Sequence, residues 1–448
     1  MNNKRNKSLL LGLMLPLLAG AQATFTENGI VYTEDLSDPS KLAVIVVAKK
    51  SPMVMEGMSA YEGDIVVPSK VAHDLDEYDV VGIAQGAFMC QELESLIIND
   101  GPTKIMTGTI NSPVLTKLVL PNTVTSIDGI MIMASEDVEF GNSLKTIKNS
   151  IFGGEMETLN FPASLQKMEM VSVMSMTGSL NLKNLKLGDK MDYIKMSISF
   201  FPGESLVIPS CKNIEMSFSQ CTNLKKLELK EGIQSIKNSF SNVEKLEELI
   251  VPGSCKVLDN AFCMTDNIQN LEFKEGVEQI IQGFFAMPKL KKLSIPKSVK
   301  EISNCFSDLS GLDELTIEEG VENITRSFRG MAKIKKFRLP ASVKAIQGSF
   351  GSMENLEELY IDTTAPIDYG SSFYSDKLKN IYVKWTTPPA IPSFIKYIID
   401  KKESEIILGN GNITDVPTVH VPKGTRNAYI EAWGLGEEVE RGIIKIAE

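Results

Sequence analysis

The stretch LKKLSIPKSVKEISNCF, from Leu290 to Phe306, returns 22 residues later as LDELTIEEGVENITRSF, and once more after that as IKKFRLPASVKAIQGSF. A fixed period of this length is typical of a solenoid, in which each repeat forms one coil of the chain. A single coil cannot bury its own apolar side, so stacked coils bury one another and build one continuous core. The repeat therefore predicts an elongated stack of coils.

Each coil combines a strand pattern with a short second segment. The pattern LxxLxI alternates as a half-buried strand does, with its apolar side chains inward and its x positions in solvent. The following VxxI is too short for a helix of typical length, so we expect a short extended or 3₁₀ segment. The repeats tile Val81 to about Val383, roughly thirteen coils of 22 residues, and their most regular column is Phe218, Phe240, Phe262, Phe284, Phe306, Phe328 and Phe350.

A slower period is superimposed on the first. The residue after the strand is proline in every other coil, as at Pro252, Pro296 and Pro340, whereas coils between them carry KEG or EEG, as at Gly276 and Gly320. Proline fixes φ, while glycine permits a turn with positive φ. Two turn chemistries that alternate predict a duplicated two-coil unit of 44 residues.

The N-terminus has the pattern of a signal peptide. Lys4, Arg5 and Lys7 make a basic start, an apolar run follows over residues 9–19, and AQA at residues 21–23 is a small-x-small cleavage site. The run is too short to span a bilayer, so we expect no transmembrane segment after cleavage. We divide the chain into a signal peptide (1–23), an N-terminal β cap (24–80), the repeats (81–384), and a degenerate coil with an insertion and a C-terminal cap (385–448).

Composition excludes several classes of function. The chain of 448 residues has a net charge of −11, which argues against nucleic acid and anionic lipid as partners. Its two histidines, His73 and His420, stand at opposite ends, and no GxSxG, GxxxxGK[ST], GxGxxG or HExxH occurs. We therefore expect no enzyme activity, no cofactor and no metal centre.

Sulfur-containing side chains are frequent. Six cysteines in an exported chain invite a disulfide interpretation, but their places in the repeat favour small buried hydrophobes. Methionine replaces Leu or Ile at many positions in the N-terminal half, including Met170, Met191 and Met196. Core filling in irregular coils is one interpretation, and an adaptable binding surface is the other.

The x positions of LxxLxI carry charge doublets that alternate in sign along the stack. Lysine pairs face acidic or amide pairs on the coils beside them, which predicts a self-neutralising ladder rather than catalytic carboxylate pairs. The doublets are Lys225–Lys226, Glu247–Glu248, Gln269–Asn270, Lys291–Lys292, Asp313–Glu314, Lys335–Lys336, Glu357–Glu358 and Lys379–Asn380.

A second exposed column changes character at its C-terminal end. After Glu228, Ile250, Glu272, Ser294 and Thr316, it reads Arg338, Tyr360 and Tyr382, and Trp385 follows closely. Tyr, Trp and Arg are enriched at binding hot spots, so Arg338, Tyr360, Tyr382 and Trp385 form a candidate contact patch. Alternatively, these aromatics pack beneath the irregular segment 388–399, because a closing segment must cover the open end of the core.

Three stretches resemble the bacterial leucine-rich repeat family called BspA-like. They are GIAQGAFMCQELESLII (residues 82–98), TTPPAI (386–391) and VHVPKGTRNAYIEAWG (419–434), and the resemblance covers nearly the whole mature chain. It implies a mostly-β leucine-rich-repeat solenoid with caps at both ends. It also implies an exported or surface protein that is associated with adhesion to host proteins and to other bacteria.

From the sequence we expect an exported, non-enzymatic, adhesin-like binding protein whose partner is a protein of the host matrix or of a bacterial surface. The alternative is a glycan-binding accessory protein of the cell envelope, which the C-terminal aromatics would serve. We expect the cell surface or the medium as its location. No sorting tail that we recognise is present, so the periplasm remains the alternative.

Overall fold

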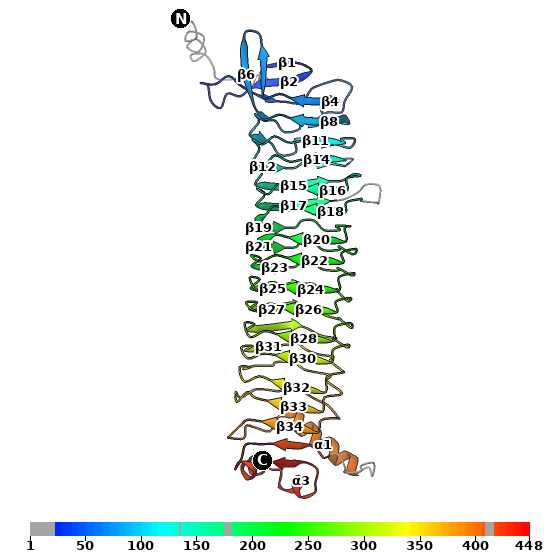
Figure 1. The fold of residues 1–448 in the computed structure, drawn as a ribbon, viewed down its shortest axis with the longest axis vertical. Helices are drawn as coiled ribbons and strands as arrows, with labels where there is room; N and C mark the ends of the chain where they lie inside the picture. The colour runs from blue at the N-terminus through cyan, green and yellow to red at the C-terminus, as the bar shows by residue number, and fades with distance from the viewer. Residues whose placement is uncertain (1–22, 134–135, 174–180, 408–415) are drawn as a thin grey trace.

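The computed structural model describes residues 23–133, 136–173, 181–407 and 416–448. Apart from its last residue, the predicted signal peptide lies outside these ranges. The described chain rises as an elongated column of stacked coils, with the N-terminal strands at one end and the helices at the other (Figure 1). The predicted mostly-β solenoid of about thirteen coils is confirmed.

The VxxI segments are strands rather than 3₁₀ turns, and they stack into one parallel sheet of thirteen strands. In Figure 1 this sheet is the stack labelled from β12 to β31. Its strands are β7 (Phe88–Met89), β10 (Ile110–Ser112), β12 (Ser126–Asp128), β13 (Met131–Ile132), β15 (Thr146–Phe152), β17 (Lys167–Val173), β19 (Lys190–Lys195), β21 (Ser210–Glu215), β23 (Ser235–Lys237), β25 (Val257–Ala261), β27 (Gln279–Gly283), β29 (Glu301–Cys305) and β31 (Asn323–Thr325).

The LxxLxI segments form a second stack of parallel strands, which we call the leucine strands. Their inward residues are buried and their x positions are exposed, as the alternation predicts. The leucine strands are β4 (Glu62–Val67), β8 (Glu92–Ile98), β11 (Lys117–Val119), β14 (Asp137–Glu139), β16 (Thr158–Asn160), β18 (Asn184–Lys186), β20 (Ser205–Ile208), β22 (Lys226–Leu229), β24 (Glu248–Val251), β26 (Asn270–Phe273), β28 (Lys292–Ile295), β30 (Glu314–Ile317), β32 (Lys336–Leu339), β33 (Glu358–Ile361) and β34 (Asn380–Val383).

Proline interrupts the leucine strands at every second coil in the middle of the column. The residue after β26, Lys274, donates its backbone N–H to the Val251 carbonyl of the coil before it, at 3.0 Å. Pro252 and Pro296 hold the same place in their coils and have no N–H to donate. In the described chain the strands accordingly pair as β20–β22, β24–β26 and β28–β30 rather than as one sheet. This pairing is the two-coil unit that the sequence predicts.

The phenylalanine column forms a continuous stack inside the solenoid. From Phe218 to Phe350, successive ring centroids lie 5.0 to 5.8 Å apart, and the ring planes are inclined by 4 to 25°. Every ring of this stack is buried. The backbone of each phenylalanine is nevertheless left-handed, as at Phe262 with a φ of 55°, because the chain must turn sharply between the two stacks of strands.

A second left-handed position lies two residues before each phenylalanine of the stack and at the matching register of the earlier coils, and we call it the outer turn column. Asparagine and glycine dominate it, since both tolerate positive φ. The column includes Gly108, Gly129, Asn149, Met170, Met196, Met216, Asn238, Asn260, Gln282, Asn304, Arg326 and Gly348.

The sulfur-containing side chains differ in how far they are buried. All six cysteines are free, and five of them are buried, as the interpretation as small hydrophobes predicts, whereas Cys263 is partly exposed. Met191 is also in the core. In contrast, Met170 and Met196 are exposed, so core filling does not account for them.

Both ends of the column carry additional elements. At the N-terminal end, β6 (Asp76–Ile83) joins a six-stranded sheet with β1 (Thr24–Glu27), β2 (Ile30–Glu34), β3 (Ala43–Val46), β5 (Lys70–His73) and β9 (Lys104–Ile105). At the C-terminal end, helix α1 (Ser393–Ile407) separates β34 from the last two strands. The remaining elements are β35 (Thr418–His420), α2 (Arg426–Trp433), α3 (Gly436–Glu440) and β36 (Lys445–Ala447).

Candidate contact surface at the C-terminal coils

Three of the predicted contact residues lie side by side on neighbouring leucine strands. The parallel register of β32, β33 and β34 places Arg338 beside Tyr360, and Tyr360 beside Tyr382. The two tyrosine rings stack with their centroids 4.5 Å apart and their planes inclined by 6°. The Arg338 guanidinium carbon lies 4.6 Å from the Tyr360 ring centroid, within cation–π range.

His420 continues this row by one strand, although sequence analysis did not include it. β35 pairs with β34 so that His420 lies beside Tyr382, and the two rings stack at 4.3 Å. The 22-residue period failed to find His420 because α1 is inserted between β34 and β35. A usable signal was present in the alternation of Val419, His420 and Val421, which places the imidazole on the outward side of a strand. We call Arg338, Tyr360, Tyr382 and His420 the aromatic row.

Trp385 does not lie on this surface. Its side chain is 4% exposed, and its indole N–H donates to the Thr363 carbonyl at 2.9 Å. The Tyr429 hydroxyl on α2 donates to the Trp385 carbonyl at 2.6 Å. Trp385 is therefore buried and joins the last regular coil to α2, so its side chain is not available as a contact residue.

Charged side chains flank the aromatic row on both sides. Glu358 pairs with Lys336 at 2.9 Å and accepts a hydrogen bond from the Tyr360 hydroxyl at 3.0 Å. The hydrogen bond from Lys336 lowers the pKa of the Glu358 carboxyl, while the bond to Glu358 raises the pKa of the Tyr360 hydroxyl. The row thus has a fixed arrangement of charges, with the Tyr360 hydroxyl protonated near neutral pH.

Asp362 joins Arg338 of the aromatic row to Lys384 through two ion pairs. Its carboxylate pairs with Arg338 at 2.5 Å and with Lys384 at 3.0 Å. Burial acts to raise the pKa of Asp362, but the hydrogen bonds from these two cations outweigh it and hold the pKa below its usual value. Asp362 therefore stays ionised and keeps the Arg338 guanidinium over the Tyr360 ring.

The stacking determines which atoms of the row meet solvent. The ring faces of Tyr360 and Tyr382 are occupied by their neighbours, so the rings present edges and hydroxyl groups outward. A sugar ring packs against the open face of an aromatic side chain, whereas an edge with hydroxyls and a guanidinium suits hydrogen bonding and apolar contact with a protein.

Grooves lead along the same exposed column toward the row. One of about 750 Å³ is lined by side chains that include Ile250, Glu272, Ser294 and Thr316, which precede Arg338 in this column. A neighbouring groove of about 490 Å³ is lined by Val207, Glu228 and Ile250 among others. The two grooves share Ile250, whose side chain is 40% exposed. The grooves end at Thr316, one coil before Arg338, and the aromatic row itself lies outside them.

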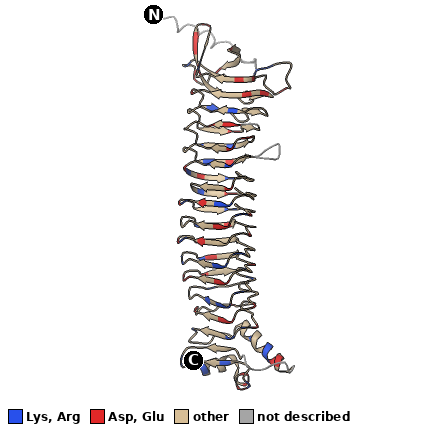
Figure 2. Ribbon diagram, turned by 45° about the vertical axis from the view of Figure 1, so that its right-hand side comes forward, with Lys and Arg blue, Asp and Glu red and all other residues tan. Residues whose placement is uncertain are grey.

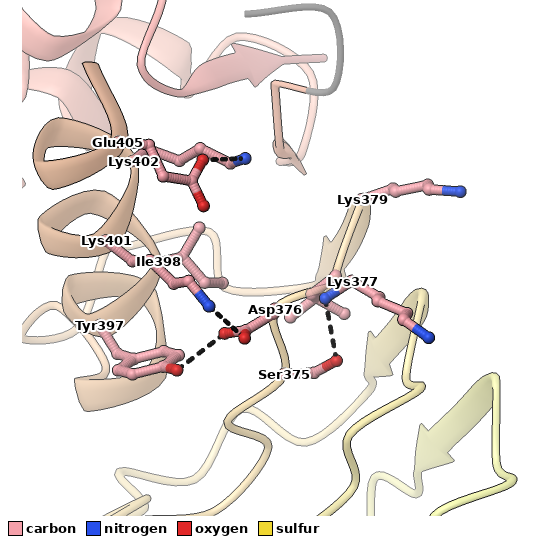
Figure 3. Close-up of a pocket in the computed structure, with 10 residues that line it drawn as sticks. Ser375, Asp376, Lys377, Lys379, Tyr397, Ile398, Lys401, Lys402 and Glu405 are labelled. Atoms are coloured by element: carbon pink, nitrogen blue, oxygen red, sulfur yellow. Dashed lines mark hydrogen bonds and ion pairs between the residues drawn. The ribbon is translucent and has the colours of Figure 1, made fainter. Parts of the chain in front are cut away.

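Helix α1 encloses a smaller cavity beside the last regular coil (Figure 3). It has a volume of about 290 Å³, with Tyr397, Lys401 and Glu405 on the helix side and Asp376 on the coil side. Asp376 receives an ion pair from Lys401 and a hydrogen bond of 2.8 Å from the Tyr397 hydroxyl. The hydrogen bond from Lys401 lowers the pKa of Asp376. These contacts hold α1 against the coil and satisfy the polar groups of the wall.

Several of the charge doublets in the C-terminal half form ion pairs across coils, as the ladder predicts. Lys292 pairs with Glu314 at 2.9 Å, and Lys379 pairs with Glu357 at 3.0 Å. These side chains are largely exposed, so each pair stabilises the fold only weakly. Figure 2 shows both signs of charge interspersed along the column.

Residues 23–133, 136–173, 181–407 and 416–448 contain no group of three or more His, Cys, Asp and Glu side chains placed to hold a metal ion. Within the same ranges, no helix has the length and apolar character needed to cross a membrane.

Comparison with known proteins identifies the repeat. The family model described as BspA type leucine rich repeat region, in six copies, matches residues 74–135, 132–202, 200–308 and 289–388. Together these matches run from Asp74 to Pro388, well over half of the chain. No curated protein matches the sequence.

Solved structures of bacterial repeat proteins are also similar. A leucine-rich repeat protein from Bacteroides ovatus is 18% identical, with a TM-score of 0.44, over 81% of this chain and 99% of that one. A leucine rich cell surface protein from Faecalibacterium prausnitzii is 14% identical, with a TM-score of 0.30, over 82% and 96%. The pneumococcal vaccine antigen PcpA is 14% identical, with a TM-score of 0.28, over 95% and 98%.

Proposed function

This chain belongs to the BspA type leucine rich repeat family, and from that premise we propose that it is an exported, non-enzymatic protein that recognises another protein. A leucine-rich-repeat frame supports this role because contact area grows with the number of coils while the side chains on the frame vary. The single observation that carries the proposal is the aromatic row, in which one guanidinium and three aromatic rings stack on the outward side of neighbouring strands.

The contact site that we propose consists of Arg338, Tyr360, Tyr382 and His420. The first three come from the candidate patch, and His420 takes the place of the buried Trp385. Arginine and tyrosine recur at binding hot spots because they combine apolar area with directional hydrogen bonds. Stacking fixes their rotamers before a partner arrives, which reduces the entropy lost on binding. The partner is a protein of the host matrix or of a bacterial surface.

The geometry supports a protein ligand over a glycan. A glycan site built on aromatics needs open ring faces, and in this row the faces of both tyrosines are covered. Glycan binding remains the alternative function, with the hydroxyl edges as its contact atoms.

We propose the cell surface or the medium as the location, because the basic and apolar start of the chain has the pattern of a signal peptide. In this arrangement residues 24–80 form the N-terminal cap, and residues 385–448 close the C-terminal end. The periplasm is the alternative location.

The test measures binding of the protein to candidate host-matrix and bacterial surface proteins, together with a panel of glycans. We expect Tyr360→Ala combined with Tyr382→Ala to remove binding to the protein ligand while the thermal melting curve keeps its shape. Alanine in place of two such anchors costs about 2 kcal/mol or more each, a loss of at least about thirtyfold per residue.

Glu272→Ala is the matched control, because Glu272 lies in the same column of exposed positions but outside the row. Its binding should equal that of the parent protein. Unchanged binding by the double tyrosine variant would exclude the row as the contact site, and binding confined to the glycan panel would replace the protein partner by the alternative.

A further inference from the structure

Three methionines occupy consecutive places in the outer turn column. Glu169 pairs with Lys195, and Lys195 with Glu215, in the parallel register of β17, β19 and β21. Each of these residues is followed by a methionine, so Met170, Met196 and Met216 stand on three neighbouring coils at the same position. No function described above uses them.

Methionine is an unfavourable choice at this position for two independent reasons. The three residues have φ values of 51°, 48° and 48°, a region where Asn and Gly are tolerated and other side chains are disfavoured. The coils on either side use Asn149 and Asn238 at the same place. The methionine side chains are also 42%, 46% and 45% exposed, so they add little to the core. Neither the backbone conformation nor burial therefore explains why methionine occupies these three positions.

Side chains in this column reach one another across coils. Asn260 donates from Nδ2 to Oδ1 of Asn238 at 2.8 Å, at the same two positions of adjacent coils. Neighbouring parallel strands are spaced by about 4.8 Å. Methionine is unbranched and has three rotatable bonds. Met196 lies one strand spacing from Met170 and from Met216, so the three sulfur atoms can converge near Met196.

We propose that Met170, Met196 and Met216 form a thioether site for a soft monovalent metal ion, Cu(I). Thioethers are soft, neutral ligands that select Cu(I) over hard cations such as Mg²⁺ and Ca²⁺. The Glu169 and Glu215 carboxylates stand next to the site but already pair with Lys148 and Lys195. Sulfur from the three methionines is accordingly the ligand set.

Thioether ligation also predicts how binding responds to pH. A thioether has no proton to lose, whereas thiol and imidazole ligands must be deprotonated before they bind a metal ion. Binding at the three methionines should therefore stay constant between pH 7 and pH 5, where a cysteine or histidine site weakens. Cys263 is the one cysteine that is not fully buried, so the experiment uses protein that carries Cys263→Ser throughout.

The experiment follows the methyl resonances of protein labelled with ¹³C at the methionine Cε, during titration with Ag(I) as a redox-inert substitute for Cu(I). We expect three methionine methyl signals to shift together and to saturate at about one Ag(I) per chain. Single Met→Asn variants assign these signals to Met170, Met196 and Met216. The saturation point should be the same at pH 7 and pH 5.

Met196→Asn removes the central ligand and introduces the residue that neighbouring coils use, so the coil should remain folded. We expect this variant to lose the concerted shift. Met264→Asn is the matched control, because Met264 is also exposed and left-handed (φ 56°) but has Asn242 and Ala286 at its place in the adjacent coils. It should bind Ag(I) as the parent does. The proposal would be overturned if the methyl signals of other methionines shifted while those of Met170, Met196 and Met216 did not. Undiminished Ag(I) binding by Met196→Asn would also overturn it.

Discussion

At the residue scale, each coil from Phe218 to Phe350 depends on a phenylalanine in a backbone conformation that disfavours it. A left-handed φ costs a non-glycine residue roughly 1–2 kcal/mol. Full burial of the ring contributes about 1.5–3 kcal/mol, and each stacked neighbour adds about 0.5–1.5 kcal/mol. Phe262 has two such neighbours, Phe240 and Phe284. The packing terms exceed the backbone cost, so the turn keeps a bulky residue where glycine would relax the backbone.

Phe262→Ala should therefore destabilise the protein by about 3–5 kcal/mol, since it removes two ring contacts and leaves a cavity in a stack that is fixed on both sides. Phe262→Leu keeps most of the buried volume and should cost clearly less. Urea unfolding followed by circular dichroism measures both. If the alanine variant unfolds at the same urea concentration as the leucine variant, the loss of stability comes from the missing ring and not from the cavity.

The sequence predicts individual residues well where they belong to a column. The phenylalanine stack and the outward positions of Arg338, Tyr360 and Tyr382 follow from the period alone. Trp385 and His420 lie outside the period, in a segment whose packing depends on contacts with α2 and β34, and the burial of Trp385 is not encoded in its local pattern. Similarly, Met191 and Met196 look alike in sequence, although the first points into the core and the second lies at an outward turn.

At the scale of the element, the unit of the column is a pair of coils. A glycine coil donates a backbone hydrogen bond to the proline coil before it, as Lys274 does to Val251, and the next proline coil cannot continue the ladder. Pro121 is the exception, because its strand β11 still pairs with β8. The alternating turn residues predict this two-coil unit from the sequence. That the sheet is interrupted between units is visible only in the backbone hydrogen bonds of the structure.

Deletion of one coil should disturb the column more than deletion of two. Removal of residues 297–340 joins Pro296 to Ala341 and brings Lys291–Lys292 beside Glu357–Glu358, so turn and charge alternation are both preserved. Removal of residues 297–318 joins Pro296 to Glu319 and places Lys291–Lys292 against Lys335–Lys336, and like charges on adjacent strands repel.

We expect the one-coil deletion to have the lower melting temperature although it retains more of the chain. Repulsion between these exposed lysines should lower the melting temperature by roughly 2–4 °C. Thermal melting of both variants at low salt measures the difference, and high salt should reduce it because these charges are exposed. A single-coil deletion that melts at or above the two-coil deletion would show that the coils act as independent units.

At the scale of the whole molecule, the two halves of the column differ in regularity. From Phe218 to Phe350 every step is 22 residues and the rings stack without interruption. In the N-terminal half, Phe140, Phe152 and Phe161 form a local cluster in which Phe152 meets the other two edge-on. In a solenoid each coil contacts only its neighbours, so local regularity becomes local stability. The aromatic row is therefore attached to the more regular half.

Hydrogen exchange should resolve these two halves. In dilute denaturant we expect the backbone amides of β10 to β17 to exchange faster than those of β25 to β31, because sub-global opening follows local packing and the phenylalanine stack spans only the second group. Mass spectrometry of peptides from both groups measures the exchange rates. Phe262→Ala breaks the stack in its middle, so it should speed exchange in β25 to β31 while leaving β10 to β17 unchanged. Equal rates in the two groups, or a Phe262→Ala variant that speeds exchange in both alike, would instead mean that the column opens as one cooperative unit. In that case a partner bound at the aromatic row would protect the N-terminal coils as strongly as the coils that it contacts.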